Sequence, residues 1–357
     1  MTFDQLAQAT QYSLPQHEKD LVLLERLAEL TEHHRRHCPE YDRLLSILYP
    51  QFERPSSLED IPYLPVGLFK SHMLRSVPEA DIFKVLQSSG TTGQSPSLIA
   101  LDRETAQRQT FALSRIMTHV LGPRRLPMIL VESPALIQDR RRFNARVAGL
   151  LGMMNFGRNH FYALDENLEI DLEGLKSFLQ RFGREPFLIF GFTFVVWQYF
   201  LQRLAGESID LSNGILIHSG GWKKLQDIAV SPAELRRRFL QETGLLRIYN
   251  FYGMVEQVGS VFLEGEDGYF YAPNFADVIV RDPVSFRVLP PGESGILQVL
   301  SILPVSYPGH SLLTEDLGVV HSIDRSTCGR LGKAFSVSGR LPRAEMRGCS
   351  DVIAASR

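Results

Sequence analysis

The chain has 357 residues, a formal net charge of −2 and three scattered cysteines, Cys38, Cys328 and Cys349. This length suffices for two or three compact lobes, and the charge gives no argument for a nucleic-acid or anionic-membrane partner. An odd number of cysteines fits a reducing cytoplasm better than a disulfide framework. The first residues lack the basic head and apolar core of a secretion signal, and no stretch approaches the roughly 18 apolar residues of a membrane-spanning helix. We therefore expect a cytoplasmic protein without a membrane span or a nucleic-acid partner.

The N-terminal 80 residues predict a helix followed by an extended segment. Residues 13–50 carry leucines at helical spacing, with Ser13 as the expected N-cap and Pro15 in the first turn. Side chains at spacings of three and four near the end of this helix could bind a metal on one helical face, namely His33, His34, His37 and Cys38. The favoured interpretation is a partly exposed helix end. Residues 51–80 are rich in proline, which forbids a long helix there.

From 81 to 270 short apolar runs alternate with stretches of helical spacing. The predicted strands are 82–87, 127–132, 187–190, 214–218 and 247–250. The predicted helices are 102–120, 139–151, 171–182, 193–205 and 231–243. This alternation predicts an α/β fold with βαβ units, a largely parallel sheet flanked by helices, and ligands at the carboxyl ends of the strands.

Turn signals divide the rest of the chain from this α/β core. Residues 271–325 contain short β-like pieces between turns and predict a small, mostly antiparallel β subdomain. Residues 326–357 contain few apolar side chains and predict a short tail carrying Cys349. The expected organisation is therefore 1–80, 81–270, 271–325 and 326–357.

A run of hydroxyl and glycine residues joins the first predicted strand to the helix after it. Its members are Ser88, Ser89, Gly90, Thr91, Thr92 and Gly93. Glycine permits positive φ and close approach of a ligand, and successive N–H groups form a nest that favours a phosphate. No Gly-Lys-Ser/Thr closes the run, so it is not a Walker loop. A flexible linker is the disfavoured alternative, because a strand and a helix flank the run directly.

Three further groups of residues follow predicted strands. Gly220 and Gly221 would let backbone approach a purine, although such a pair is a weak signal. An aromatic ring can stack on adenine and a carboxylate four residues later can help to hold Mg²⁺, which are the roles expected for Tyr252-Gly253 and Glu256. The alternative places Tyr252 in the core and Glu256 on the surface. The apolar side chains that could line an acyl pocket, or simply belong to the core, are Phe192, Phe194 and Trp222.

These motifs, in this order, resemble those of the acyl-adenylate-forming superfamily. The hydroxyl and glycine run resembles its phosphate loop, and Tyr252-Gly253-Met254-Val255-Glu256 resembles its adenine and metal motif, with Val255 where threonine is usual. Leu313-Thr314-Glu315-Asp316-Leu317 resembles its Thr-Gly-Asp-Leu motif, with Glu315 at the usual glycine. The resemblance implies an adenylate-forming fold, ATP and Mg²⁺ as cofactors, and ribose binding by Asp316.

The end of the chain resembles the superfamily less closely. Gly339-Arg340 is similar to the Gly-Arg motif that precedes the hinge, where Arg340 would contact ribose or the α-phosphate; Gly329-Arg330 is a competing match. Few residues follow, so we expect the usual large C-terminal domain with its catalytic lysine to be lacking. The candidate substitutes for that lysine are Lys84, Lys70 and His218.

A cysteine in the tail suggests how the reaction is completed. The thiolate of Cys349, beside Arg347, could attack an acyl-adenylate and leave as a thioester. Cys328 is the rival thiol, and an incidental cysteine is the alternative. Arg347-Gly348-Cys349, the stretch at 65–70 and the helix at 33–41 resemble the acyl-protein synthetase (LuxE-type) family of the bacterial fatty-acid reductase. The resemblance implies fatty acid activation to acyl-AMP, transfer to Cys349 and delivery to a LuxC-like acyl reductase.

Two other functions compete with this one. A ligase resembling phenylacetate–CoA ligase would pass the acyl group to coenzyme A or an amine. A non-catalytic nucleotide-binding partner subunit would explain the departures at Val255 and Glu315. Acid-dependent ATP cleavage separates an enzyme from such a subunit, and coenzyme A dependence separates the two enzymes.

Overall fold

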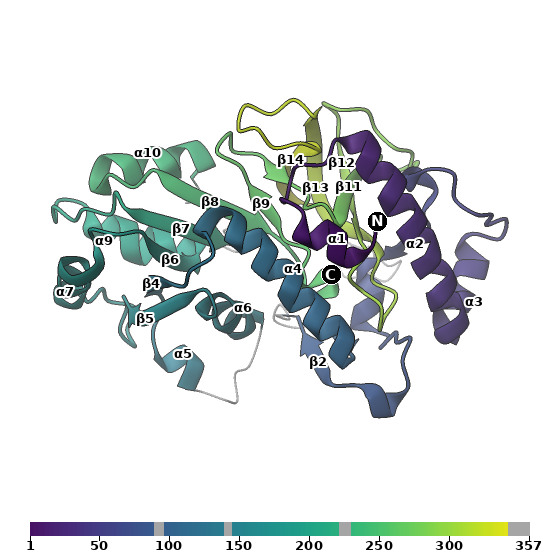
Figure 1. Ribbon diagram of the computed structural model, residues 1–357, viewed down its shortest axis with the longest axis horizontal. Helices are drawn as coiled ribbons and strands as arrows, with labels where there is room; N and C mark the ends of the chain where they lie inside the picture. Colours follow the sequence, from purple (N-terminus) through teal and green to yellow (C-terminus); the bar gives the residue numbers. More distant parts are fainter. Residues whose placement is uncertain (89–95, 139–144, 221–229, 342–357) are drawn as a thin grey trace, which may run out of the picture.

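A mixed sheet of 12 strands organises the computed structural model, which describes residues 1–88, 96–138, 145–220 and 230–341 (Figure 1). Its strand order is β11-β12-β13-β14-β10-β9-β8-β7-β6-β4-β5, with β1 beside β13. The strands from β5 to β8 run parallel to one another, and the remaining pairs of the path are antiparallel. This mixed α/β architecture confirms the predicted fold class.

Four of the five parallel strands follow predicted ones with small shifts at their ends. They are β4 (Leu126–Val131), β5 (Gly157–Tyr162), β6 (Phe187–Phe192), β7 (Gly214–Ser219) and β8 (Arg247–Tyr252). The sequence did not predict β5, because this strand is mostly polar and contains no apolar run. β5 lies at the edge of the sheet, where only one side of the strand pairs with a neighbour. The predicted strand 82–87 is the other difference, since β2 (Lys84–Gln87) pairs antiparallel with β3 (Leu98–Leu101) in a separate small sheet.

Helices cover both faces of the parallel strands. One apolar cluster joins side chains of α4 (Arg103–Leu121) and α6 (Ala145–Met154) to one face of β4, β6 and β7. A second cluster joins the opposite face to α7, to the helical segment after β6 and to α10. The bounds of these helices are α7 (Leu172–Phe182), α8 (Thr193–Val195), a π-helical turn (Val196–Leu201), α9 (Gln202–Leu204) and α10 (Pro232–Thr243).

The antiparallel strands continue the same sheet beyond β8. Their bounds are β9 (Phe262–Glu264), β10 (Phe270–Tyr271), β11 (Ala276–Arg281), β12 (Ser294–Ser301), β13 (Ser311–Ile323) and β14 (Lys333–Arg340). β14 comes from the part of the chain that the sequence predicted as a tail, yet it lies between β13 and β10. Ala334 and Phe335 are buried there. Two buried apolar residues are enough to hold β14 in the sheet, because β13 and β10 pair with it on both sides.

The N-terminal region folds as three helices and a series of short elements. They are α1 (Phe3–Gln8), α2 (Gln16–His37), α3 (Pro39–Leu48), β1 (Leu64–Pro65) and the 3₁₀ turns η1 (Leu58–Asp60), η2 (Val66–Lys70) and η3 (Glu79–Asp81). The predicted single helix is interrupted at Cys38, whose backbone is extended, because a residue before proline is disfavoured in the α region. A short helix α5 (Ala135–Gln138) follows β4.

The predicted N-cap of α2 is wrong. Ser13 donates instead to the Thr10 carbonyl, 2.8 Å away, and Pro15 is the N-cap residue. The backbone N–H of Gln16 donates to the carboxylate of Asp324, at 2.9 and 3.1 Å. The helix therefore receives its cap from a residue 308 positions away, which no local pattern could indicate.

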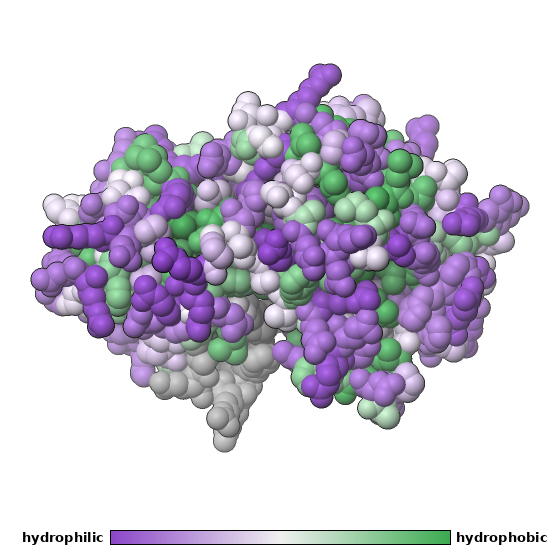
Figure 2. Space-filling view, viewed as in Figure 1, coloured by the Kyte–Doolittle hydropathy of each residue, from purple (hydrophilic) through white to green (hydrophobic). Residues whose placement is uncertain are grey.

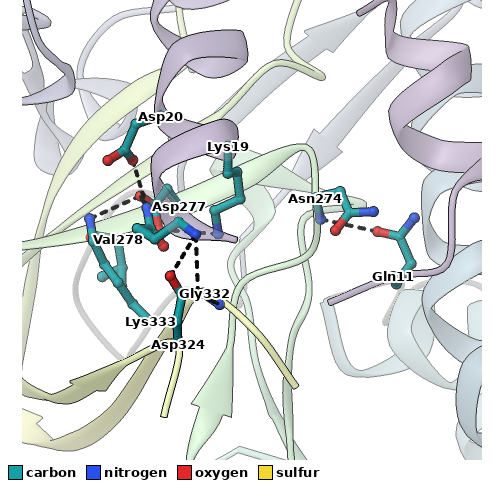
Figure 3. Close-up of polar contacts among 10 residues, drawn as sticks. Gln11, Lys19, Asp20, Asn274, Asp277, Val278, Asp324, Gly332 and Lys333 are labelled. Carbon is teal, nitrogen blue, oxygen red and sulfur yellow. Dashed lines mark hydrogen bonds and ion pairs between the residues drawn. The ribbon is translucent and has the colours of Figure 1, made fainter. Parts of the chain in front are cut away.

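A buried group of charges attaches α2 to the antiparallel strands (Figure 3). Asp277 of β11 has no exposed surface and lies between two ammonium groups. Lys19 Nζ is 3.4 Å from Asp277 Oδ1, and Lys333 Nζ donates to Asp277 Oδ2 at 2.9 Å. Gln16 Nε2 also donates to Asp277 Oδ2, at 2.7 Å. Because an unpaired buried charge is very unfavourable, these contacts fix the position of α2.

None of the described helices could cross a membrane. None of them combines the length and the apolarity that a crossing needs. Hydrophilic residues cover most of the face shown in Figure 2, with apolar residues interspersed among them.

Candidate active site

Three of the predicted nucleotide-binding residues lie together. Tyr252 ends β8, Asp316 lies in β13 and Arg340 ends β14. The Tyr252 hydroxyl donates to Asp316 Oδ2 at 2.7 Å, and Arg340 Nε donates to Asp316 Oδ1 at 3.2 Å. Each carboxylate oxygen of Asp316 therefore has one protein donor.

Aromatic side chains hold Tyr252 in this position. Its ring contacts three phenylalanines from the strands between β8 and β13, with centroid distances of 5.9 to 6.5 Å: Phe262, Phe270 and Phe335. Burial, and then the charge of Asp316, raise the pKa of Tyr252 well above its usual value. The side chain is therefore a neutral phenol that donates a hydrogen bond to Asp316.

A β-bulge sets the direction of Asp316. Residue pairing between β12 and β13 shifts at this point, and Thr314 Oγ1 donates to the Leu297 carbonyl at 2.8 Å while accepting from Asp316 N at 3.1 Å. Glu315 lies within the bulge without a positive φ, so the departure from the usual glycine is accommodated. The Glu315 carboxylate lies 4.0 Å from Lys70 Nζ. One of the candidate lysines therefore contacts the residue that directly precedes Asp316.

A buried threonine that directly follows β6 contacts the last two residues of β7. Thr193 Oγ1 donates to the Ser219 carbonyl at 3.1 Å and lies 2.9 Å from His218 Nδ1. Gly220 follows with a φ of 82°, a left-handed conformation that favours glycine. Burial, and then Arg236, lower the pKa of His218 to about 3. His218 is therefore neutral and cannot supply the positive charge of a lysine. Lys84, another candidate substitute for the missing lysine, lies on β2.

Glu256 is buried, which contradicts the alternative that placed it on the surface. It lies in the 3₁₀ turn η7 (Val255–Gln257) and is 7% exposed. Its backbone carbonyl accepts a hydrogen bond from the Tyr307 hydroxyl at 2.8 Å. The sequence gave no signal for Tyr307, which lies 51 positions away.

Some of the other predicted residues are described by the structure, and the rest lie outside the described residues. Phe192 packs against Phe190 with centroids 5.8 Å apart, and Phe194 packs against Tyr199 at 5.7 Å. Ser88, the first residue of the hydroxyl and glycine run, is the last described residue before the gap, and its N–H donates to the Ser97 carbonyl at 3.1 Å. Gly253 follows Tyr252 directly. The predicted residues that lie outside the described ones are Ser89, Gly90, Thr91, Thr92, Gly93, Gly221, Trp222 and Cys349.

The arginine of the competing Gly329-Arg330 match is buried and bonded within the protein. Arg330 is 7% exposed, donates to the Leu263 carbonyl at 2.7 Å and lies over the ring of Tyr12, 4.4 Å from its centroid. Arg340, in contrast, is 69% exposed and touches Asp316. Of the two arginines, Arg340 is therefore the exposed one and the one in contact with Asp316.

The histidines of α2 have protein partners. His34 Nε2 donates to the Pro304 carbonyl at 3.2 Å, and its Nδ1 accepts from the Ser76 hydroxyl at 2.7 Å. His33 Nε2 donates to the Val305 carbonyl at 3.1 Å. His34 is fully buried, so the interpretation of this region as a partly exposed helix end is wrong for His34.

Comparison with known proteins decides the family. The model of the family described as "Acyl-protein synthetase, LuxE" matches residues 3–356. The chain belongs to this family. A long-chain-fatty-acid–luciferin-component ligase of Vibrio harveyi is 27% identical over 304 residues, covering 82% of this chain and 77% of the relative. The ligase of the same name from Aliivibrio fischeri is 25% identical, covering 82% and 78%.

Solved structures show the same fold. An open conformation of 2-hydroxyisobutyryl-CoA ligase in complex with 2-HIB-AMP and CoA matches with a TM-score of 0.68 and 20% identity, covering 96% of this chain and 81% of that one. This LuxE-family protein is thus an ATP-dependent acyl ligase with the fold of an adenylate-forming enzyme.

Proposed function

We propose that this protein activates a long-chain fatty acid with ATP and then carries the acyl group as a thioester on Cys349. The observation that supports this most directly is the meeting of Tyr252, Asp316 and Arg340 at 2.7 and 3.2 Å. The substrate class follows the names of the relatives from Vibrio harveyi and Aliivibrio fischeri.

The donor and acceptor chemistry of these residues fits a nucleotide. A carboxylate such as that of Asp316 accepts hydrogen bonds from ribose hydroxyls, and its lone pairs exceed the two donors already present. Within the described chain only Nε of the Arg340 guanidinium has a hydrogen-bond partner, so its terminal N–H groups are placed to meet a phosphate. The hydroxyl and glycine run from Ser88 to Gly93 would present backbone N–H groups to the phosphates, and Gly220 and Gly221 would let backbone approach the purine.

Glu256 is the proposed protein ligand for Mg²⁺. Sites for this ion commonly use one or two carboxylates together with substrate phosphates, and the described residues contain no cluster of three or more His, Cys, Asp or Glu side chains placed to hold a metal. A single buried carboxylate fits such a shared site. The ion, when bound with ATP, neutralises charge on the phosphates.

The two chemical steps each exchange one bond. In the first, a carboxylate oxygen of the fatty acid attacks the α-phosphorus, the bond to the bridging oxygen breaks and pyrophosphate leaves. In the second, the Cys349 thiolate attacks the acyl carbonyl carbon and AMP leaves, which forms a thioester. A LuxC-like acyl reductase is the proposed recipient of the acyl group. Phe192, Phe194 and Trp222 are the proposed contacts of the acyl chain.

Intact-protein mass spectrometry tests the proposal. The protein is incubated with ATP, Mg²⁺ and straight-chain fatty acids of graded length, and AMP is measured in parallel. We expect one added acyl mass, released by hydroxylamine and absent from Cys349→Ala, while AMP formation persists in that variant when hydroxylamine is supplied as acceptor. Cys328→Ala is the matched control and should acylate normally.

The other outcomes distinguish the alternatives. AMP formation that requires coenzyme A, without an acyl adduct, would move the acceptor off this chain. An adduct that survives in Cys349→Ala but disappears in Cys328→Ala would assign the thioester to the other thiol. Absence of both AMP and adduct would refute fatty-acid activation.

A further inference from the structure

The loop between β12 and β13, residues 302–310, is almost entirely buried. Every residue except Val305 is buried, and Tyr307 has no exposed surface. Loops usually lie on the surface because their backbone polar groups need water. Burying this loop therefore requires partners supplied by other elements.

Those partners come from both sides of the hydroxyl and glycine run. The Ser306 carbonyl accepts from Ser76 N at 2.7 Å, before β2. Ser306 Oγ donates to the Ala100 carbonyl of β3 at 2.9 Å, and Ser306 N donates to Thr105 Oγ1 of α4 at 3.2 Å. The loop is thus tied to the segments that enter and leave the proposed phosphate loop.

Histidines of α2 hold the same loop from another direction. His33 and His34 donate to the carbonyls of Val305 and Pro304. Thr31 Oγ1 donates to the Leu27 carbonyl, so it accepts from His310 Nε2, 3.0 Å away. The rings of His34 and His310 stack with centroids 5.0 Å apart. These contacts fix the loop as a rigid part of the core.

The far end of the loop contacts the turn that carries Glu256. The Tyr307 hydroxyl donates to the Glu256 carbonyl at 2.8 Å. Gln257 Nε2 donates to the Gly309 carbonyl at 2.8 Å and to the Val299 carbonyl at 3.0 Å. A Cβ on Gly309 would lie 2.8 Å from the Glu256 carbonyl oxygen, so the close approach requires glycine.

We propose that Tyr307 is a positioning residue that sets the place of the Glu256 turn relative to β3 and α4. The inference rests on the proposed function, in which Glu256 binds Mg²⁺. Mg²⁺ demands near-ideal octahedral geometry, so a ligand turn that shifts by a fraction of an ångström loses affinity for the ion. Loss of a residue that orients a metal ligand typically costs 10–100-fold in metal affinity.

Metal binding, rather than turnover, is the decisive measurement. Mn²⁺ serves as a spectroscopic probe, and free Mn²⁺ is followed by electron paramagnetic resonance in the presence of the protein and α,β-methylene-ATP. We expect Tyr307→Phe to weaken Mn²⁺ binding roughly tenfold while binding of the metal-free nucleotide, measured with EDTA, is unchanged. A purely structural role would lower the melting temperature without separating the two affinities.

Tyr271→Phe is the matched control. Tyr271 is also fully buried and donates to Asp267 Oδ2 at 2.6 Å, so the variant loses a tyrosine hydrogen bond at least as strong elsewhere; we expect unchanged Mn²⁺ binding. Gln257→Leu is a second test, because it removes the other contact between the loop and η7, and it should weaken Mn²⁺ binding in the same direction.

Glu256→Gln separates failure of the inference from failure of its premise. If Glu256→Gln weakens Mn²⁺ binding while Tyr307→Phe and Gln257→Leu bind as the unaltered protein does, the positioning role is refuted. If Glu256→Gln itself binds Mn²⁺ normally, the assignment of the metal to Glu256 fails, and the positioning role fails with it.

Discussion

Replacing Asp277 by asparagine should destabilise the protein strongly. The substitution keeps the shape of the side chain but removes the one carboxylate between Lys19 and Lys333. Burial raises the pKa of Asp277, but the two ammonium groups outweigh this and hold it below its usual value. Asp277→Asn would leave Lys19, which is 1% exposed, as a buried charge without its counter-ion.

The expected magnitude follows from the burial of Asp277 and Lys19, which are 0% and 1% exposed. Removing one member of a buried ion pair costs about 3–5 kcal/mol, a large fraction of the roughly 5–15 kcal/mol by which proteins are stable. At about 2–4 °C per kcal/mol for a large domain, the melting temperature should fall by roughly 10 °C. The exposed pair Lys176–Glu173 is the matched comparison, since such pairs contribute at most about 1 kcal/mol.

Thermal and urea denaturation of Asp277→Asn and Glu173→Gln at pH 7 measure this difference. Burial already lowers the pKa of Lys19 from its usual value, and loss of Asp277 lowers it further. The unfolded state then binds more protons than the folded state, so the stability of Asp277→Asn should rise between pH 7 and pH 9.5. A loss below about 1 kcal/mol at pH 7, with no recovery at high pH, would refute the reasoning.

Two further predictions concern acid stability and nucleotide affinity. Burial lowers the pKa of His310 and of His218 to about 3. Below pH 6.5 the unfolded state therefore binds more protons than the folded state. The free energy of unfolding should fall by about 1.4 kcal/mol per pH unit for each histidine as the pH decreases toward 3. Urea titrations between pH 7.5 and 5 check this, and His310→Gln should reduce the slope; an unchanged slope would contradict it. Tyr252→Phe removes a hydrogen bond to the charged carboxylate of Asp316, worth about 1.5–3 kcal/mol, so KM for ATP should rise roughly tenfold or more, and an unchanged KM would argue against a role for Tyr252 in ordering Asp316.

Local sequence patterns were sufficient for most of the α/β core. Apolar runs predicted β4, β6 and β7 because these strands are buried on both faces, which demands continuous apolar residues. β8 was predicted as well, although only Ile248 and Tyr249 of it are buried. The edge strand β5 and the short strand β3 escaped the same criterion, and the antiparallel pairing of β2 with β3 was not predicted. In β5 the residues after Gly157 are partly or fully exposed, so the apolar signal on which the prediction depends is weak.

The site was predictable as a set of motifs and not as an arrangement. Tyr252, Asp316 and Arg340 were identified from residue type and order, because ring, carboxylate and guanidinium have distinct chemistry. The hydrogen bonds between them were not predictable, since they join β13 to β8 and to β14 across 64 and 24 positions of sequence. Phe335 supports Tyr252 from a region whose composition indicated a tail.

The sequence by itself determined the alternation of strands and helices, the family and the residue types of the site, because backbone preferences and side-chain chemistry are local properties. The tertiary structure decided that residues 333–340 form an inner strand, that Asp324 caps α2 and that the 302–310 loop reaches Glu256. Each of these depends on a buried polar group finding a partner far away in the chain. Burial without a partner is costly, and which partner satisfies it is settled only when the whole chain has packed.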